Sequence, residues 1–138
     1  MSEVVYIALG SNLGDRVTAL TRARAAIAAL KGTRIIGESA VEETAPLGPV
    51  PQGPYLNQMI AIETDLSPRS LFGALQRIER AAGRVRTVRW GPRTLDLDIV
   101  MIEGREFSDD TLTIPHPELP NRDFWLRELE ELRGANHV

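Results

Sequence analysis

Two aspartates, Asp96 and Asp98, stand one residue apart within an apolar run, and this pair constrains the fold more than any other feature. Successive side chains of a strand point to opposite faces, so the two carboxylates would share one face while Leu97, Ile99 and Met101 would share the other. One face of the strand would then pack in the core, and the other would carry the reactive carboxylates. Two like charges this close repel each other unless a cation lies between them, and hard divalent ions bound by oxygen are the usual answer. The pair therefore predicts a strand that holds Mg²⁺ on one face.

Positive charge in this chain is carried almost wholly by arginine, since Lys31 is the sole lysine. Arg84, Arg86, Arg89 and Arg93 lie within ten residues, shortly before the aspartate pair. The planar guanidinium fork suits phosphate oxygens, so this cluster predicts an anionic, metal-bound phosphate ligand. A solvated surface loop is the alternative interpretation. No Gly-x-x-x-x-Gly-Lys-Ser/Thr element exists, so arginine and Mg²⁺ would do the work that lysine does in P-loop enzymes.

Composition and charge are those of an ordinary globular chain. Its 138 residues and 43% apolar content predict one domain over residues 1–138. The formal charge of −3 argues against a nucleic-acid partner, whose backbone requires a basic surface. The lack of cysteine excludes disulfides and thiolate metal sites, and no apolar run is long enough to span a bilayer. With no basic leader at its start, the chain is expected to be cytoplasmic and to have no membrane partner.

The order of apolar patterns predicts the fold class. One helical stripe consists of Leu13, Val17, Leu20, Ile27 and Leu30. The predicted order is strand, helix, strand, strand, helix, strand, over residues 3–9, 13–30, 35–44, 56–64, 67–83 and 96–102. This is the ferredoxin-like α+β plan, in which two helices cover one face of a four-stranded antiparallel sheet and leave the other face for ligand or loops. A proline-rich loop spans 45–54, and a short amphipathic helix is expected over 125–132.

Motifs spread along the chain resemble those of one family. The most specific is Gly91-Pro92-Arg93-Thr94-Leu95-Asp96-Leu97-Asp98. The others, in order, are 8–12 (Ala-Leu-Gly-Ser-Asn), 44–49 (Thr-Ala-Pro-Leu-Gly-Pro), 55–57 (Tyr-Leu-Asn), 76–79 (Gln-Arg-Ile-Glu), 83–86 (Gly-Arg-Val-Arg), 115–116 (Pro-His) and 121–124 (Asn-Arg-Asp-Phe). Together they cover most of the chain and resemble the 6-hydroxymethyl-7,8-dihydropterin pyrophosphokinases of folate biosynthesis.

The resemblance implies an ATP-dependent diphosphotransferase that acts on the pterin hydroxymethyl group and releases AMP. Asp96 and Asp98 would hold two Mg²⁺ ions that bridge the ATP phosphates. Arg84 and Arg93 would clamp the triphosphate, with Arg84 on a loop that closes over the reaction. These four residues are the predicted catalytic set, and the reaction's partners are ATP and 6-hydroxymethyl-7,8-dihydropterin.

The resemblance also implies two sets of binding residues. Those for ATP are Gln76, Glu79, Arg86, Trp90, Arg93, Ile99, Thr113, His116 and Arg122. Those for the pterin are Thr44, Leu47, Tyr55, Asn57 and Phe124. Asn57 would recognise the polar edge of the ring, while Tyr55 and Phe124 would stack on its faces. Spacing alone favours a solvated helix surface for Gln76 and Glu79, and an aromatic pair could equally belong to the core.

Departures from the family pattern leave alternatives open. The loop over 86–90 is one residue shorter than in the family, Ala45 replaces a frequent proline, and the C-terminal segment is shortened. Leu126, Leu129 and Leu132 would pack on the sheet edge or on a second subunit, so an oligomer is not excluded. A catalytically inactive relative is one competing interpretation. An RNA-binding module of the same topology is another, although the negative charge and the paired aspartates argue against it.

Overall fold

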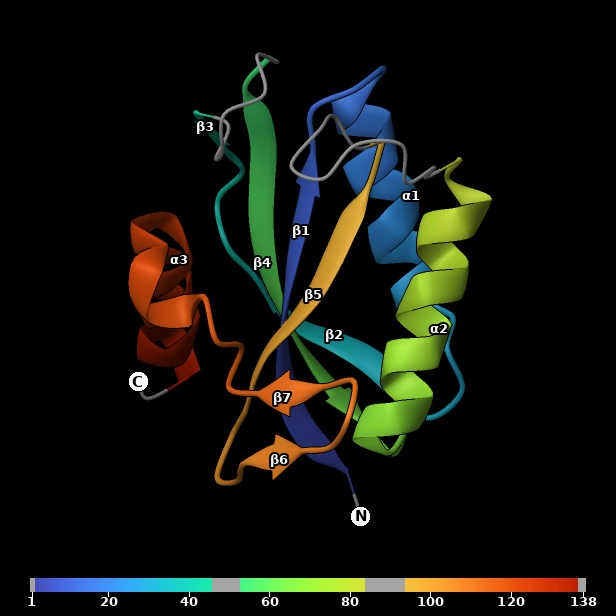
Figure 1. The fold of residues 1–138 in the computed structure, drawn as a ribbon, viewed down its shortest axis with the longest axis vertical. Coiled ribbons are helices and arrows are strands. Elements are labelled where there is room, and N and C mark those ends of the chain that lie inside the picture. Colours follow the sequence, from blue (N-terminus) through green and yellow to red (C-terminus); the bar gives the residue numbers. More distant parts are fainter. Residues whose placement is uncertain (1, 46–52, 84–93, 137–138) are drawn as a thin grey trace.

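The computed structural model describes residues 2–45, 53–83 and 94–136. Its larger sheet and helices follow the predicted order, and a small hairpin and a third helix come after them (Figure 1). The elements are β1 (Glu3–Ser11), α1 (Arg16–Ala28), β2 (Thr33–Glu38), β3 (Glu42–Thr44), β4 (Tyr55–Thr64), α2 (Pro68–Ala81), β5 (Asp96–Ile102), β6 (Phe107–Ser108), β7 (Thr113–Ile114), the 3₁₀ turn η1 (Leu119–Asn121) and α3 (Asp123–Asn136).

The main sheet has the strand order β2-β4-β1-β5, and every neighbouring pair is antiparallel. The ferredoxin-like α+β prediction is therefore confirmed. The predicted strand over 35–44 is in fact two strands: β2 pairs with one half of β4 and β3 with the other half. The hairpin of β6 and β7 was not predicted, because each of its strands has two residues, too few to show a period.

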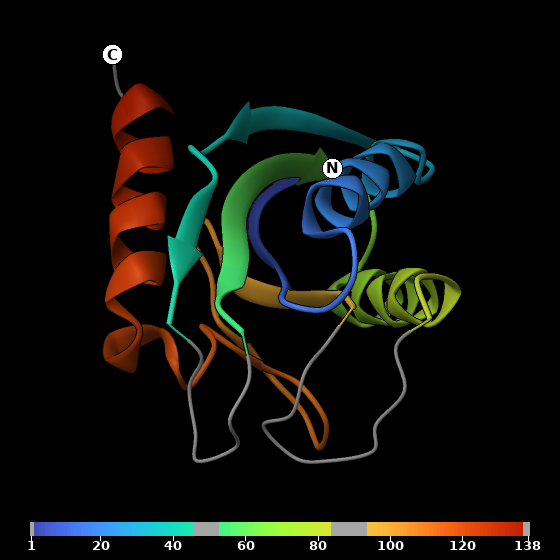
Figure 2. The ribbon, with the colours of Figure 1, turned by 90° about the horizontal axis from the view of Figure 1, so that it is seen from above.

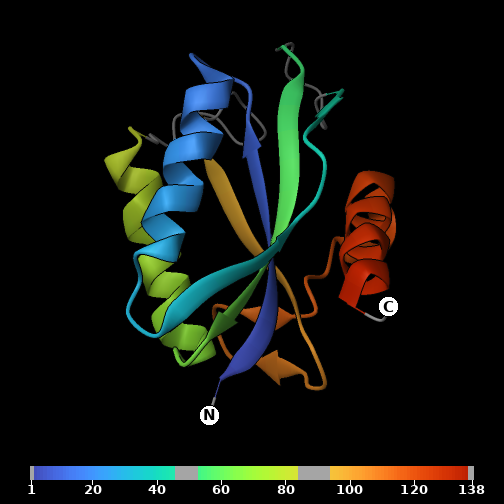
Figure 3. The same ribbon diagram turned by 180° about the vertical axis from the view of Figure 1, so that it is seen from behind.

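Helices α1 and α2 lie side by side on one face of the sheet (Figures 2 and 3). Each begins at a capping side chain: Asp15 accepts a hydrogen bond from Thr18 N at 3.1 Å, and Ser67 accepts one from Ser70 N at 3.2 Å. The start of α1 at Arg16 corrects the predicted stripe, because Leu13 lies before the cap and is 50% exposed. Val17 is also exposed, at 65%.

The core between these helices and the sheet is apolar. It is formed by side chains of β1, β4 and β5 together with side chains of α1 and α2, and it includes Ile7, Leu20, Ile27, Ile60, Leu75 and Leu97. All of these are almost completely buried. No helix in the described ranges is long and apolar enough to cross a membrane.

A bulge in β5 changes which side chains share a face. Tyr6 of β1 pairs with Met101, whereas the next residue, Ile7, pairs with Ile99, so Val100 is the extra residue. Met101 consequently packs against the second core cluster with Val100 and does not share the face of Leu97 and Ile99. The predicted alternation is therefore correct for 96–99 and wrong for Met101.

The second face of the sheet is partly covered by α3, which has 14 residues, as many as α2 (Figure 2). Trp125, Leu129 and Leu132 are buried against Tyr6 and Met59 of the sheet. This face of the sheet was expected to be left for ligand or loops. That expectation holds only for the part of the face that α3 does not cover. Leu129 and Leu132 pack against the sheet within this chain, and Leu132 reaches its edge strand β2, where a Cβ atom at Gly37 would lie 3.3 Å from Leu132 Cδ2. Leu126 remains 41% exposed.

Candidate active site

The sheet brings Asp96 and Asn57 to the same level on either side of Gly10. In the strand register, Gly10 of β1 pairs with Asp96 of β5 and with Asn57 of β4. Residues paired across strands point to the same face, and strands lie about 4.8 Å apart, so the two side chains leave one face about 10 Å from each other. One level further into the sheet, Ala8 pairs with Asp98. Small residues thus form the floor between the carboxylates and the amide.

Gly10 is required by the closeness of its neighbours. A Cβ atom at this position would lie 3.1 Å from Asn57 Oδ1 and 3.3 Å from Tyr55 Cδ1. Both distances are tighter than ordinary van der Waals contact. The absent side chain lets the amide of Asn57 and the ring of Tyr55 lie against the β1 backbone at the end of the sheet.

Asn57 is buried, with 6% of its surface exposed, and its Nδ2 donates a hydrogen bond to Thr44 Oγ1. With Nδ2 bonded to this hydroxyl, Oδ1 lies on the side of Gly10. Thr44 and Tyr55 are half-buried and pair across β3 and β4. Three of the residues that the sequence assigns to the pterin therefore lie together at one strand end.

Asp98 faces an imidazole whose orientation is held by backbone contacts. His116 Nε2 lies 3.6 Å from Asp98 Oδ1, while His116 Nδ1 accepts a hydrogen bond from Glu118 N at 3.1 Å. The backbone N–H of His116 donates to Val100 O at 2.9 Å, which ties the loop to the bulge of β5. Because Nδ1 is an acceptor, a neutral His116 carries its proton on Nε2 and directs it toward Asp98.

Trp125 supports two of the predicted nucleotide residues. The His116 ring meets it edge-on, with 5.0 Å between centroids and an interplanar angle of 86°. The Arg122 guanidinium lies 4.3 Å above its ring centroid, a cation–π contact. Arg122 Nε is buried and has no hydrogen-bond acceptor in the described part of the molecule. Sequence reasoning missed this role of Trp125, although the scarcity of aromatic residues, at 5%, was a usable signal.

Phe124 is half-buried and lies edge-on to Trp125, with 6.3 Å between centroids. It packs partly against the core cluster beneath α3, so the alternative of core packing describes part of its surface. Its remaining surface lies at the start of α3.

Glu79 differs from the solvated helix surface that its spacing alone favours. It is buried, at 8% exposure, and its Oε2 accepts a hydrogen bond from Leu97 N at 2.8 Å. That amide lies between the two aspartates on an edge strand, where no further strand would pair with it. Glu79 therefore holds the beginning of β5 against α2.

Three other predicted nucleotide residues lie on α2, β5 and β7. Gln76 is half-buried on α2 and Thr113 is exposed on β7. The side chain of Ile99 is 3% exposed within the core against α1 and α2, so any nucleotide contact from Ile99 would come from its backbone. The remaining residues assigned from the sequence, Leu47, Arg84, Arg86, Trp90 and Arg93, lie outside the described residues.

The donors around Asp96 and Asp98 suit a hard cation. Both residues are half-buried at the open end of the sheet, and both offer only carboxylate oxygen. Within the described ranges no group of three or more His, Cys, Asp or Glu side chains could enclose a metal ion. An ion held by two carboxylates would take its other ligands from water and phosphate, as Mg²⁺ does. The residues therefore fit Mg²⁺ better than a metal that requires a complete protein cage.

One family and several curated proteins match this chain over most of its length. The sequence model of the family described as 7,8-dihydro-6-hydroxymethylpterin-pyrophosphokinase (HPPK) matches residues 6–134. Two curated relatives, both called 2-amino-4-hydroxy-6-hydroxymethyldihydropteridine pyrophosphokinase, come from Haemophilus influenzae and Bacillus subtilis. The first is 46% identical over 127 residues, 92% of this chain and 79% of that protein. The second is 41% identical over 132 residues, 96% of this chain and 79% of that protein.

A third relative is a longer protein. Folic acid synthesis protein fol1 of Schizosaccharomyces pombe is 38% identical over 128 residues, which are 93% of this chain and 18% of fol1. An antiparallel α+β sheet with paired carboxylates at one strand end, one of them beside an imidazole, has the chemistry of a phosphoryl-transfer enzyme. The family match specifies which one. The chain belongs to the HPPK family and is a pyrophosphokinase of folate biosynthesis, acting on hydroxymethyldihydropterin.

Proposed function

We propose that the two strands that flank Gly10 divide the reaction between them, with ATP phosphates on the Asp96 side and the pterin on the Asn57 side. The observation that carries this proposal is the strand register, which pairs Gly10 with both residues. A separation of about 10 Å across two strand spacings leaves room for a flat ring and a phosphate in line.

The transfer itself is a displacement at the β-phosphorus of ATP. The pterin hydroxymethyl oxygen forms a bond to that phosphorus, the bond to the oxygen bridging the α- and β-phosphates breaks, AMP leaves, and the hydroxyl proton is released. Asp96 and Asp98 would hold two Mg²⁺ ions. When bound, these ions supply neutralisation of the phosphate charge.

His116 and Arg122 would bind phosphate oxygens beside the carboxylates. An Nε2–H of His116 and the guanidinium of Arg122 are both hydrogen-bond donors, and both side chains are held by Trp125. Arg84 and Arg93 would complete the clamp, an assignment that comes from the family motif. Gln76, Arg86, Trp90, Ile99 and Thr113 are proposed nucleotide contacts on the same ground.

Asn57 would bind the polar edge of the pterin through Oδ1, because Thr44 already takes its Nδ2. Tyr55 and Phe124 would cover the faces of the ring, with Leu47 and Thr44 beside it. Glu79 would act on the nucleotide side indirectly, by fixing the Leu97 amide between the two metal-binding residues.

The reaction type is tested by incubating the chain with Mg-ATP and 6-hydroxymethyl-7,8-dihydropterin and separating the nucleotides by chromatography. We expect AMP that forms only when pterin and Mg²⁺ are both present. ADP in place of AMP would contradict pyrophosphoryl transfer. ATP binding without AMP would identify a catalytically inactive relative.

We further propose that the enzyme works in the cytoplasm with its two small substrates and without a nucleic-acid partner. The lack of cysteine suits a reducing compartment. The formal charge of −3 is opposite to that of a nucleic-acid-binding surface. Size-exclusion chromatography with light scattering would report whether copies of the chain associate.

A further inference from the structure

Strand β4 loses its regular partner at the point where β2 ends and β3 begins. The last pair with β2 is Glu38 with Ile60, and the first pair with β3 is Glu42 with Asn57. Gln58 and Met59 lie between these pairs and face the linker over 39–41, which joins β2 to β3. An interrupted ladder leaves backbone groups that need other partners.

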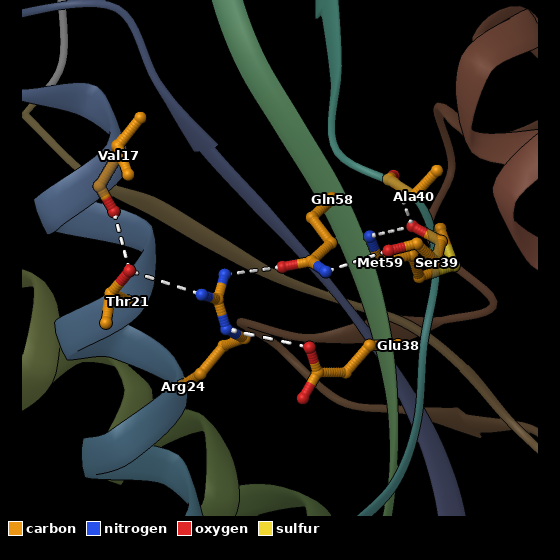
Figure 4. A network of polar contacts seen from close by, with 8 residues as sticks. All are labelled: Val17, Thr21, Arg24, Glu38, Ser39, Ala40, Gln58 and Met59. Atoms are coloured by element: carbon orange, nitrogen blue, oxygen red, sulfur yellow. Dashed lines mark hydrogen bonds and ion pairs between the residues drawn. The ribbon is translucent and has the colours of Figure 1, made fainter.

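Two buried side chains replace the missing ladder bonds, as Figure 4 shows. Ser39 N donates to Met59 O at 2.8 Å, and Met59 N donates to Ser39 Oγ at 2.9 Å. Gln58 Nε2 donates to Ser39 O at 2.8 Å. Both Gln58 and Ser39 are 4% exposed. The linker is thus held to β4 by one backbone bond and two bonds that depend on side-chain chemistry.

The orientation of the Gln58 amide is set from the other side by α1. Arg24 Nη1 donates to Gln58 Oε1 at 2.7 Å, and Arg24 Nε lies 3.8 Å from Glu38 Oε1 (Figure 4). Because guanidinium only donates, the amide oxygen must face Arg24 and the amide nitrogen must face Ser39. The linker is also held from α3, since Ala40 N donates to Glu131 Oε2 at 3.0 Å.

This clamp lies directly beside the proposed pterin-binding residues. Gln58 follows Asn57 in β4, and the linker leads into β3, whose last residue is Thr44. Thr44 Oγ1 accepts from Asn57 Nδ2, and that contact keeps Asn57 Oδ1 on the side of Gly10. A shift of the linker would move β3 and break the contact between Thr44 and the amide of Asn57.

We propose that Gln58 is a positioning residue for pterin recognition: it clamps the 39–41 linker so that β3 presents Thr44 to Asn57. The inference rests on the proposed pterin site at Asn57. Gln58 acts through its neighbours and contacts no substrate. Its side chain lies on the α1 side of the sheet, opposite the face of Asn57 and Asp96.

The informative variant is Gln58→Glu, which keeps the size of the side chain and the acceptor for Arg24 but replaces the donor to Ser39 O with an acceptor. We expect the KM for the pterin to rise about tenfold, while the dissociation constant for Mg-ATP changes less than about twofold. Arg24→Ala is the second variant, since it leaves Gln58 in place and frees its amide; it should raise the pterin KM about threefold.

Thr64→Val is the matched control on the same strand. Thr64 is 1% exposed and shares a hydrogen bond with Thr33, at the opposite end of β4 from Asn57. This control should lower the urea midpoint without changing either substrate constant. If Gln58→Glu and Arg24→Ala lower the urea midpoint like Thr64→Val and leave the pterin KM unchanged, the clamp is merely structural and the proposal is overturned.

Asn57→Ala separates failure of the clamp from failure of the pterin site. If Asn57→Ala raises the pterin KM but Gln58→Glu does not, the pterin site stands and the positioning role falls. If Asn57→Ala has no effect on that KM, both fall. If Gln58 acts through Asn57, the double variant should be no worse than Asn57→Ala alone; additive effects would contradict this route.

Discussion

The two faces of the sheet differ in what covers them and in what they do. The face toward α1 and α2 carries a large cluster of buried apolar side chains. The face toward α3 carries a smaller apolar cluster under the helix, and beyond it the strand ends that hold Asp96, Asp98 and Asn57. Carboxylates that must meet a cation and water cannot lie in a closed apolar layer, because burial of an unpaired charge is costly. In the proposed assignment, one face contributes mainly stability and the other combines stability with chemistry.

Each face of the sheet also has a buried acid, but within the described residues only the one on the α2 side, Glu79, accepts a hydrogen bond, from Leu97 N. Glu128 is 2% exposed, and its carboxylate oxygens accept no hydrogen bond from a donor group in the described structure. Burial, with the Glu42 carboxyl beside it, raises the pKa of Glu128 to about 8. The helix that supports His116 and Arg122 is therefore docked less favourably at high pH than its apolar residues alone would suggest.

The largest effect should come from Asp96→Asn on the site face. We expect kcat to fall about 10³-fold while the urea midpoint stays near that of the parent, since a bound metal contributes several kcal/mol to transition-state stabilisation. Steady-state assay of AMP release and urea unfolding monitored by circular dichroism would measure the two quantities. A variant that unfolded readily, or that kept its rate, would contradict the assignment of this residue to chemistry.

Ile27→Ala tests the opposite face. Ile27 is fully buried against the sheet, so its truncation should cost about 3 kcal/mol of unfolding free energy by loss of apolar burial and creation of a cavity. Both substrate constants should remain within about twofold of the parent at a temperature where the variant is folded. A large change in either KM would show that the two faces are less independent than the packing indicates.

Trp125→Leu should affect stability and nucleotide binding together. Trp125 belongs to the core cluster under α3 and also contacts His116 and Arg122. We expect a loss of about 2 kcal/mol in unfolding free energy, less than for Ile27→Ala because leucine refills part of the space. The KM for Mg-ATP should rise while that for the pterin changes little, since His116 and Arg122 both rest on the indole ring. Equal changes in both constants would argue for general loosening of α3.

Glu128→Gln should have the smallest effect on activity, and its effect on stability should depend on pH. The pKa is higher in the folded chain, about 8 against an ordinary value of 4.5, so the folded state binds the proton more tightly and stability falls as pH rises between these values. Arg127 opposes this shift, whereas Glu42 and Glu131 add to it. At pH 8.5 the variant should be more stable than the parent by about 2 kcal/mol, a value discounted for partial screening.

Urea unfolding at pH 5.5 and pH 8.5 would measure this difference. Glu130→Gln is the matched control, because Glu130 is an exposed carboxylate on the same helix. The control should follow the parent at both pH values. A parent whose stability is the same at both would contradict the raised pKa of Glu128.

Local sequence signals predicted the elements well wherever the relevant force acts within a few residues. Ser67 followed by Pro68 marked the start of α2, and the alternation from Asp96 to Ile99 gave the strand and its polar face. Prediction failed where a distant partner intervened. The bulge at Val100 reverses the faces only because of how β5 pairs with β1, and the break at Ser39 exists only because β4 exchanges one neighbour for another.

In the candidate site, too, the sequence predicted which residues take part but not how they are placed in space. Motif resemblance selected Asp98, His116 and Asn57 as residues, but no spacing in the chain indicated that Gly10 pairs with both Asp96 and Asn57. Nor did it indicate that Glu79, whose position favoured a solvated surface, is buried beneath the strand that carries the aspartates.

By itself the sequence determined the start of α2 and the family, and it predicted the candidate reacting and binding groups, because each depends on residue type and short spacing. Only the tertiary structure decided which groups face each other, that α3 packs on the second face of the sheet, and that Gln58 joins α1 to the proposed pterin side. Those properties depend on strand register and on packing between segments far apart in the chain, where a shift of one residue exchanges the two faces of a strand.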